Sequence, residues 1–201
     1  PNGIDVEQWR VHPVAGADNE LRLVAVMRLA PRKRAIPLVT MVESAARLVP
    51  SDRQLRLVIV GNGPLESRVR KAVDDSVANC AIDLVGRLTP DAVRATLASS
   101  DVFIAPALLE SFGIAALEAR TAGLPVLAYA QTGISSFVRD GVEGLLARDD
   151  EQMVRNIVRL AVDRDLRERI TEHNRSTEPN ESWPHVLELA DVAYERAARI
   201  G

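Results

Sequence analysis

Short apolar runs alternate with segments of helical composition along most of the 201-residue chain. The first run, LRLVAVM at 21–27, is apolar enough to be buried on both faces, as the strands of a parallel sheet are. Such an alternation predicts an α/β fold, a doubly wound parallel sheet of about six strands with helices on both faces and right-handed crossovers. The expected strands are 21–27, 55–60, 82–85, 102–105, 126–128 and 145–146. The expected helices are 35–49, 65–77, 90–99, 113–122, 135–138, a helical region from 151 with a break at about 176–182, and 184–200.

Candidate site residues follow the carboxyl ends of the expected strands. They include Arg28, Gly61, Arg87 and Glu110. In open α/β sheets, ligands bind at this edge of the sheet. We therefore expect these residues to converge on one ligand site.

The segment from Asp101 to Tyr129 reads as strand, loop, helix and strand, and it holds two carboxylates eight positions apart, Glu110 and Glu118. The helix entry after Glu110 carries free backbone N–H groups and the positive end of the helix dipole, which attract an anion. Two carboxylates beside an anion site suit a ligand with hydroxyls on both sides of its phosphates, such as a nucleotide-sugar. The alternative is that Glu110 is a solvated loop residue and Glu118 an exposed helix residue.

Arg28 stands directly after the first strand, and Lys33 follows at the start of the next helix. A guanidinium binds phosphate oxygens in a bidentate way and an ammonium acts as a point charge, so this pair could hold a diphosphate. Because Arg32 and Arg34 lie in the same segment, an ordinary solvated cluster is the alternative.

Composition excludes several other classes of function. A hydrophobic content of 47% with 3% aromatic residues fits an α/β protein better than a β-sandwich, and a net charge of −3 argues against a nucleic-acid binder. The single cysteine, Cys80, excludes an internal disulfide and a thiolate metal cluster. The three histidines show no metal-ligand spacing and no Asp-x-Asp motif is present, so we expect neither a bound metal nor a cofactor. No apolar run reaches the ~20 residues of a transmembrane segment.

The motif ESFGIAALEARTAGLPV resembles the Glu-x7-Glu signature of the retaining glycosyltransferases of family 4, which have the GT-B fold. Further matches in the family's order are PNGID, the arginine of VMRLAPRK, VIVGNGP, LVGRL and DGVEGLL. Together they cover roughly residues 1–185, which corresponds to the family's C-terminal, donor-binding half. The resemblance thus implies a Rossmann-like domain that binds a nucleoside-diphosphate sugar such as a UDP- or GDP-hexose.

The resemblance also implies a role for each matching residue. Arg28 and Lys33 would hold the diphosphate and stabilise its departure, and Glu110 would contact the hydroxyls of the donor sugar. Glu118 would accept hydrogen bonds from the ribose. Backbone contacts to sugar and phosphate would come from Phe112, Gly113 and Ile114, and the nucleotide side of the site from Gly61, Arg87 and Leu88.

Three positions depart from the family's pattern. Met27 and Arg34 replace glycines that are usual beside the basic pair, so the approach to the phosphates and the basic side chain that reaches them stay open. Ile134 stands where a second glycine is usual in the loop near the sugar, which points to altered sugar selectivity.

The domain organisation follows from the same resemblance. Residues 1–20 would end an interdomain linker, 21–177 form the donor-binding domain, and 178–201 form a helix that packs back toward an N-terminal domain. Because the chain starts at Pro1, we expect a fragment that binds the donor but does not catalyse transfer. An acceptor sugar or lipid would bind through the other domain, in the cytoplasm or at the cytoplasmic face of the membrane.

We thus expect the C-terminal half of a hexosyltransferase that moves a hexosyl unit to an acceptor hydroxyl with retention. Two other interpretations remain. The first is a non-catalytic nucleotide-binding or interaction domain, which would bind a nucleotide as well as its sugar conjugate. The second is a GT-B-fold epimerase of nucleotide-sugars, which would normally lack this ordered set of motifs.

Overall fold

The structure is a computed structural model that describes residues 3–76 and 80–198, and the side chains of the last helix only as far as residue 191. The predicted helix ends at Val77 and Ile200 lie outside the described residues, as do Pro1 and Asn2. Within the described part, six parallel strands form one sheet in the order β3-β2-β1-β4-β5-β6. The strands are β1 Glu20–Val26, β2 Gln54–Val60, β3 Cys80–Gly86, β4 Val102–Ile104, β5 Val126–Tyr129 and β6 Gly144–Ala147. The predicted doubly wound sheet is therefore confirmed.

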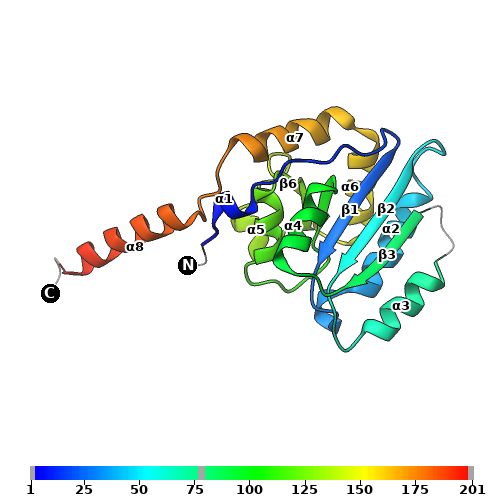
Figure 1. Cartoon of the computed structure of the whole chain (residues 1–201), viewed down its shortest axis with the longest axis horizontal. Coiled ribbons are helices and arrows are strands. Elements are labelled where there is room, and N and C mark those ends of the chain that lie inside the picture. Colours follow the sequence, from blue (N-terminus) through cyan, green and yellow to red (C-terminus); the bar gives the residue numbers. More distant parts are fainter. Residues whose placement is uncertain (1–2, 77–79, 199–201) are drawn as a thin grey trace.

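Helices cover both faces of this sheet (Figure 1). The α-helices are α1 Val6–Trp9, α2 Ala35–Ala46, α3 Glu66–Asp74, α4 Pro90–Ala98, α5 Ile114–Thr121, α6 Asp150–Val162, α7 Arg164–Ser176 and α8 Trp183–Ala198. Two 3-10 turns, η1 Pro31–Lys33 and η2 Gly133–Ser136, follow β1 and β5. The short helix expected at 135–138 is thus a 3-10 turn that starts two residues earlier.

The core is split into two apolar layers because successive side chains of a strand point to opposite faces. In β1, Leu23 belongs to the layer formed with α2, α6 and α7, and its neighbour Val24 belongs to the layer formed with α4 and α5. Both side chains have no exposed surface. Burial on both faces explains why this strand is an almost continuous apolar run in the sequence.

The strand order places a topological switch point beside β1. The chain leaves β1 for β2 and β3 on one side and then returns to β4 on the other. The connections after β1 and β4 therefore diverge, and the divergence leaves a crevice at the carboxyl ends of these two strands.

The helical region after residue 150 has a break that the sequence analysis missed. The helix ends at Val162, and the carboxylate of Asp163 accepts a hydrogen bond from the backbone N–H of Leu166 at 2.9 Å. This contact is an N-terminal cap, which starts α7 as a separate helix. A capping aspartate can be found in a sequence, but the apolar spacing on both sides of it conceals the boundary.

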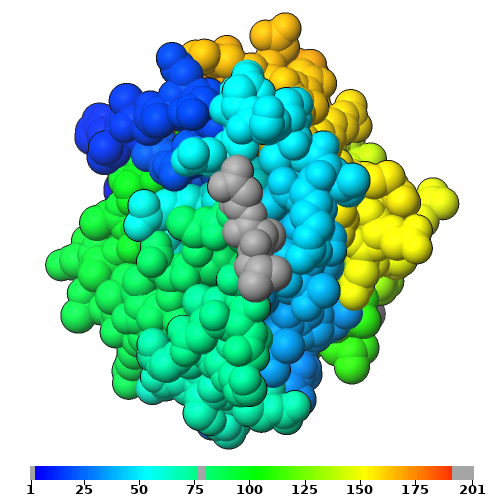
Figure 2. Space-filling view, turned by 90° about the vertical axis from the view of Figure 1, so that its right-hand side faces the viewer, coloured from blue at the N-terminus to red at the C-terminus, as the bar shows by residue number. Residues whose placement is uncertain are grey.

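The N-terminal segment lies beside the segment that leads into α8. Ile4 and Ser182 form a parallel bridge, and α8 projects away from the body of the domain (Figure 1). On a face turned by 90°, the N-terminal segment, the turn before β2 and α7 come together (Figure 2). Arg53 donates to the backbone oxygen of Asp18 at 2.8 Å, and Arg164 of α7 lies 3.4 Å from its carboxylate.

Candidate donor-binding site

A cavity of about 300 Å³ occupies the switch point between β1 and β4. Its walls include Arg28 and Lys33 from the connection after β1, and Glu110, Gly113 and Ile114 from the connection after β4. The structure therefore brings five of the predicted site residues together, whereas Gly61 and Arg87, also expected at this site from their places after strand ends, do not line it. The volume is within the range of small-ligand sites.

The α5 helix begins at this cavity, and Gly113 is its N-cap residue with φ 89°. A Cβ on Gly113 would lie 2.5 Å from the side chain of Ile134, so only glycine fits this entry. No acidic residue stands in the first turn of α5 to offset the positive end of the helix dipole. Free N–H groups and an uncompensated dipole together attract an anion.

Lys33 and Glu110 meet across the cavity. The Lys33 Nζ lies 2.5 Å from the Glu110 Oε2, and the two side chains are 24% and 20% exposed. The loop of Glu110 is held from behind, because its backbone oxygen accepts from the N–H of Gly133 at 2.7 Å. A cation and a hydrogen-bond acceptor are thus adjacent in the cavity and partly shielded from water.

Arg28 lies at the cavity with an exposed side chain. Within residues 3–76 and 80–198, its guanidinium has no hydrogen bond or ion pair. It is therefore ready to contact an incoming anion at the rim.

The two departures beside the basic pair have structural explanations. Met27 lines the cavity and is partly buried against the core, so it narrows the site where the family commonly has glycine. The guanidinium of Arg34 is directed away, onto the carboxylate of Asp150, with contacts of 3.0 and 2.7 Å. Of the four basic residues in this segment, Arg28 and Lys33 line the cavity, whereas Arg32 and Arg34 do not.

Glu118 lies one turn beyond Ile114 on α5 and does not line the cavity. It is partly buried, and among the described residues it has no hydrogen-bond or ion-pair partner. Burial raises its pKa to about 7 from an ordinary 4.5. An unpaired carboxylate in this position has unused acceptor capacity for a ligand's hydroxyls.

The remaining predicted residues also lie outside the cavity wall. The N–H of Gly61 donates to the oxygen of Gly86 at 2.7 Å, so the ends of β2 and β3 adjoin each other. Arg87 beyond this junction is exposed, whereas Leu88 packs on the core layer of α4 and α5. Phe112 packs against Phe137 with the two rings tilted at 50° and their centroids 5.4 Å apart.

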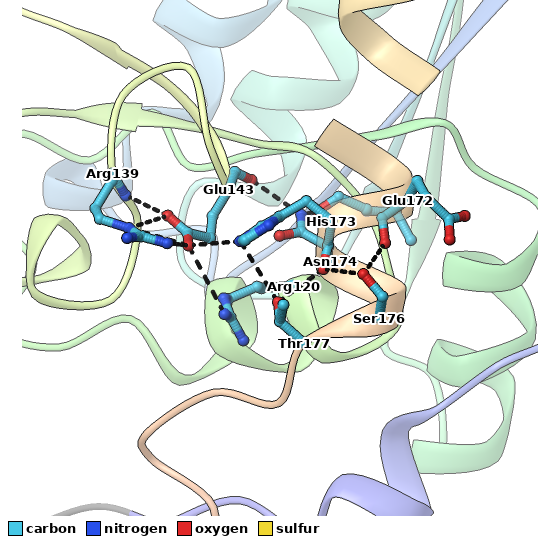
Figure 3. A network of polar contacts seen from close by, with 9 residues as sticks. Arg120, Arg139, Glu143, Glu172, His173, Asn174, Ser176 and Thr177 are labelled. Carbon is cyan, nitrogen blue, oxygen red and sulfur yellow. Dashed lines mark hydrogen bonds and ion pairs between the residues drawn. The ribbon is translucent and has the colours of Figure 1, made fainter. Parts of the chain in front are cut away.

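A buried carboxylate, Glu143, is a feature that sequence reasoning missed (Figure 3). Its side chain is 2% exposed and accepts from Arg139, while Nε2 of His173 lies 3.0 Å from its Oε1. Arg120 of α5 lies 3.9 Å from the same oxygen. Burial alone would raise the pKa of Glu143, but the hydrogen bonds from Arg139 and His173 outweigh it and lower the pKa to about 2. The network fastens α7 and the turn before β6 to the helix that carries Glu118.

Glu143 lies in the segment DGVEGLL, which in the sequence is only a match to a family motif. An acidic residue between Val142 and Gly144 gives no sign of burial in the sequence. Among the described residues, no group of three or more His, Cys, Asp or Glu side chains is arranged to hold a metal ion. None of the described helices is long and apolar enough to span a membrane.

Fold and site together define a doubly wound α/β domain with an anion-attracting ligand site at its switch point. A family model described as "Glycosyl transferases group 1" matches residues 7–177, and the chain belongs to this family. The family predicted from the motifs is therefore confirmed, as is the Rossmann-like architecture of GT-B proteins.

Individual proteins agree with this assignment. The chain is 32% identical over 182 residues to a GDP-mannose-dependent alpha-(1-6)-phosphatidylinositol monomannoside mannosyltransferase of Mycobacterium tuberculosis, an alignment that covers 82% of this chain and 46% of that protein. The fold matches Anabaena HepE in complex with UDP and glucose, with a TM-score of 0.75, 16% identity and coverage of 98% of this chain and 55% of HepE. It also matches the C-terminal domain of a group 1 glycosyltransferase, LpcC of Francisella tularensis, with a TM-score of 0.67, 18% identity and coverage of 87% and 95%. The chain spans about half the length of the curated relatives it matches.

Proposed function

We propose that this chain binds the nucleoside-diphosphate-sugar donor of a retaining glycosyltransferase that transfers a hexosyl unit to an acceptor hydroxyl. The observation that carries the proposal is the contact between Lys33 and Glu110 at the N-terminus of α5, inside the switch-point cavity of a group 1 family member. The cavity joins a cation, a carboxylate and a helix N-terminus. A sugar diphosphate presents the complementary groups, which are phosphate oxygens and hydroxyls.

The diphosphate would lie between Arg28, Lys33 and the first N–H groups of α5. Charge-assisted hydrogen bonds from these groups are stronger than neutral ones and favour the leaving nucleoside diphosphate, on which negative charge builds as the glycosidic bond breaks. Positive charge fixed in advance at this point stabilises the transition state more than the ground state. The retained configuration of the sugar is part of the proposal and follows from the family resemblance.

The sugar would lie on the Glu110 side of the cavity. Once the diphosphate binds the ammonium of Lys33, the carboxylate oxygens of Glu110 are free to accept hydrogen bonds from the sugar hydroxyls. Ile134 closes this side in place of a glycine, and it packs beside the α5 entry. Its bulk reduces the room for the sugar, which favours one hexose over others.

The nucleoside would extend from the diphosphate past the carboxyl ends of β2 and β3. Glu118 would accept the ribose hydroxyls, and Gly61, Arg87 and Leu88 would border the base. Backbone groups of Phe112, Gly113 and Ile114 would contact sugar and phosphate. Two carboxylates at opposite ends of a donor differ from a hydrolase pair, in which both flank one bond.

The division of the chain is also proposed. Residues 1–20 would complete a linker, 21–177 would bind the donor, and 178–201 would return toward a second domain that holds the acceptor. The name of the M. tuberculosis relative suggests a lipid-linked acceptor, reached at the cytoplasmic face of a membrane. The acceptor itself would bind outside the donor site described above.

The test is a calorimetric titration of the 201-residue chain with UDP, GDP, ADP and their hexose conjugates. We expect one base to bind selectively, its sugar conjugate to bind more tightly, and the affinity to fall about tenfold in Lys33→Ala, the loss of one charge-assisted contact. Lys71→Ala is the matched control, because Lys71 is paired with Asp75 on the exposed face of α3. Absence of binding by the folded chain would contradict the proposal. Equal affinity for nucleotide and conjugate would favour a nucleotide-binding module instead.

A further inference from the structure

Arg34 has an unusual backbone conformation directly after Lys33. With φ 57° and ψ 37°, it is the single non-glycine residue of the described chain in the left-handed region. It ends η1 and begins α2, since its N–H donates to Pro31 and its oxygen accepts from Leu38. A residue with a Cβ adopts this conformation at a cost in free energy, so the conformation persists where surrounding contacts hold the backbone in place.

The contacts of the Arg34 guanidinium hold the backbone in this conformation. One nitrogen donates to the backbone oxygen of Pro106 at 3.3 Å and to the hydroxyl of Tyr129 at 2.9 Å. The two terminal nitrogens also bind both carboxylate oxygens of Asp150. The side chain is 18% exposed, and its carbon Cζ lies 5.7 Å from the centre of the Tyr129 ring.

These partners join the site to three strand ends. Pro106 follows β4 and begins the loop that carries Glu110, Tyr129 ends β5, and Asp150 is the first residue of α6 after β6. The hydroxyl of Tyr129 also donates a hydrogen bond to the Asp150 carboxylate, and this contact holds in place the carboxylate that Arg34 binds. Arg34 therefore connects the loop of Lys33 directly to the loop of Glu110.

Adjacent Cα atoms are about 3.8 Å apart, so the backbone of Lys33 cannot move far while Arg34 is held in place. The ammonium of Lys33 in turn lies on Glu110. We propose that Arg34 is a positioning residue: by bridging Pro106, Tyr129 and Asp150, it fixes the placement of the loop of Lys33 relative to the loop of Glu110, so that one sugar diphosphate can engage both side chains. This inference rests on the proposed function for its ligand, and Arg34 itself does not touch that ligand.

The first experiment compares Arg34→Gly with Arg34→Ala. Both lack the guanidinium, but glycine tolerates the left-handed backbone that alanine does not. We expect Arg34→Gly to melt at a higher temperature than Arg34→Ala, and both to lose about tenfold in affinity for the nucleoside diphosphate that the unsubstituted chain binds. Wild-type affinity in Arg34→Gly would overturn the proposal. It would also be overturned if the affinities of the two variants followed their melting temperatures.

A double substitution distinguishes positioning from direct contact. In a Lys33→Ala background, Arg34→Gly should weaken binding by less than about twofold, because its effect passes through Lys33. If the two losses multiply, Arg34 acts independently of Lys33 and the proposal is wrong.

A last measurement needs no nucleotide. The chain has two lysines, Lys33 and Lys71, so limited acetylation followed by peptide mass spectrometry gives the reactivity of Lys33 relative to an exposed internal standard. We expect the relative reactivity of Lys33 to rise several-fold in Arg34→Gly, as its ion pair with Glu110 loosens. Unchanged reactivity would overturn the positioning role. Raised reactivity in a chain that binds no nucleotide would support that role while contradicting the proposed function.

Discussion

Nζ of Lys33 lies 2.5 Å from Oε2 of Glu110, although the two residues are 77 positions apart. In the ligand-free chain, the cation proposed for the diphosphate and the carboxylate proposed for the sugar thus neutralise each other. A bound donor would separate these two side chains and would replace their ion pair with its own contacts to each of them.

The Glu110→Gln substitution tests this competition. It removes the partner charge of Lys33, so we expect a free nucleoside diphosphate to bind about threefold to tenfold more tightly, while the preference for the sugar conjugate shrinks. Calorimetric titration with both ligands measures the two effects. Asp75→Asn is the control, because it frees Lys71 on the surface. Equal losses for both ligands would show that the pair does not compete with phosphate.

The Arg28→Ala substitution tests the rim of the cavity. We expect about tenfold weaker binding of the diphosphate and a weaker dependence of affinity on sodium chloride, since an exposed cation acts through a screened charge. The control is Arg68→Ala, which removes an exposed arginine from α3 without approaching the cavity. An equal effect of both substitutions would indicate general attraction and not a site.

Glu118 predicts a pH dependence of stability. Burial raises the pKa of Glu118 to about 7, so between pH 4.5 and 7 the folded chain holds a proton that the unfolded chain has lost. The contribution of Glu118 to the free energy of unfolding is therefore fully present below about pH 4.5 and is lost as the pH rises through about 7. Denaturant titrations at several pH values should show a flatter profile for Glu118→Gln over this window. An unchanged profile would mean that Glu118 titrates normally.

Glu118 also predicts proton release on binding. Ribose hydroxyls donate to the ionised carboxylate, so a bound nucleotide should lower the pKa of Glu118 and release a proton near pH 6.5. Calorimetry in two buffers of different ionisation enthalpy measures this proton. Its persistence in Glu118→Gln would assign it to another group.

The Glu143→Gln substitution should destabilise the fold strongly. It removes the charge that Arg139 and the buried Arg120 share, and breaking a buried pair costs about 3–5 kcal/mol of unfolding free energy. The exposed pair of Glu168 and Arg164 is the control, and Glu168→Gln should cost less than about 1 kcal/mol. Since the pKa of Glu143 is lowered to about 2, its contribution is present above about pH 4.5 and is lost as the pH falls toward 2. Similar losses for both variants would rule out a special role for the network.

Gly61→Ala tests the junction of the first two strands. A Cβ at this position would lie 1.8 Å from the backbone oxygen of Met27, which cannot rotate away, so we expect a loss of about 3 kcal/mol or more. Gly141 also has a positive φ, 77° against 134° at Gly61, but open space around it, and Gly141→Ala should cost only about 1 kcal/mol. Denaturant midpoints compare the two, and equal losses would show that strain, not the close approach, limits Gly61.

The candidate site was partly readable in the sequence. Arg28, Gly61, Arg87 and Glu110 were predicted to converge because parallel strands deliver their carboxyl ends to one edge. The structure places Arg28 and Glu110 in one cavity, together with Lys33, Gly113 and Ile114, but leaves Gly61 and Arg87 outside its wall. The position of Glu118 outside the cavity wall could not be predicted. Which neighbours bury a helical carboxylate depends on how the helix is rotated against the sheet and on the elements packed beside it.

Local chemistry in the sequence determined the secondary structure and the class of fold. Apolar runs bounded by Gly and Pro make strands, Asp163 and Gly113 cap helices, and their alternation requires a parallel sheet. The tertiary structure alone decided the partners of charged side chains, such as Arg34 with Asp150 across 116 positions and Arg120 with Glu143. A side-chain contact of a few ångströms requires two segments to be placed side by side, and that placement comes from the strand order and helix packing of the whole domain.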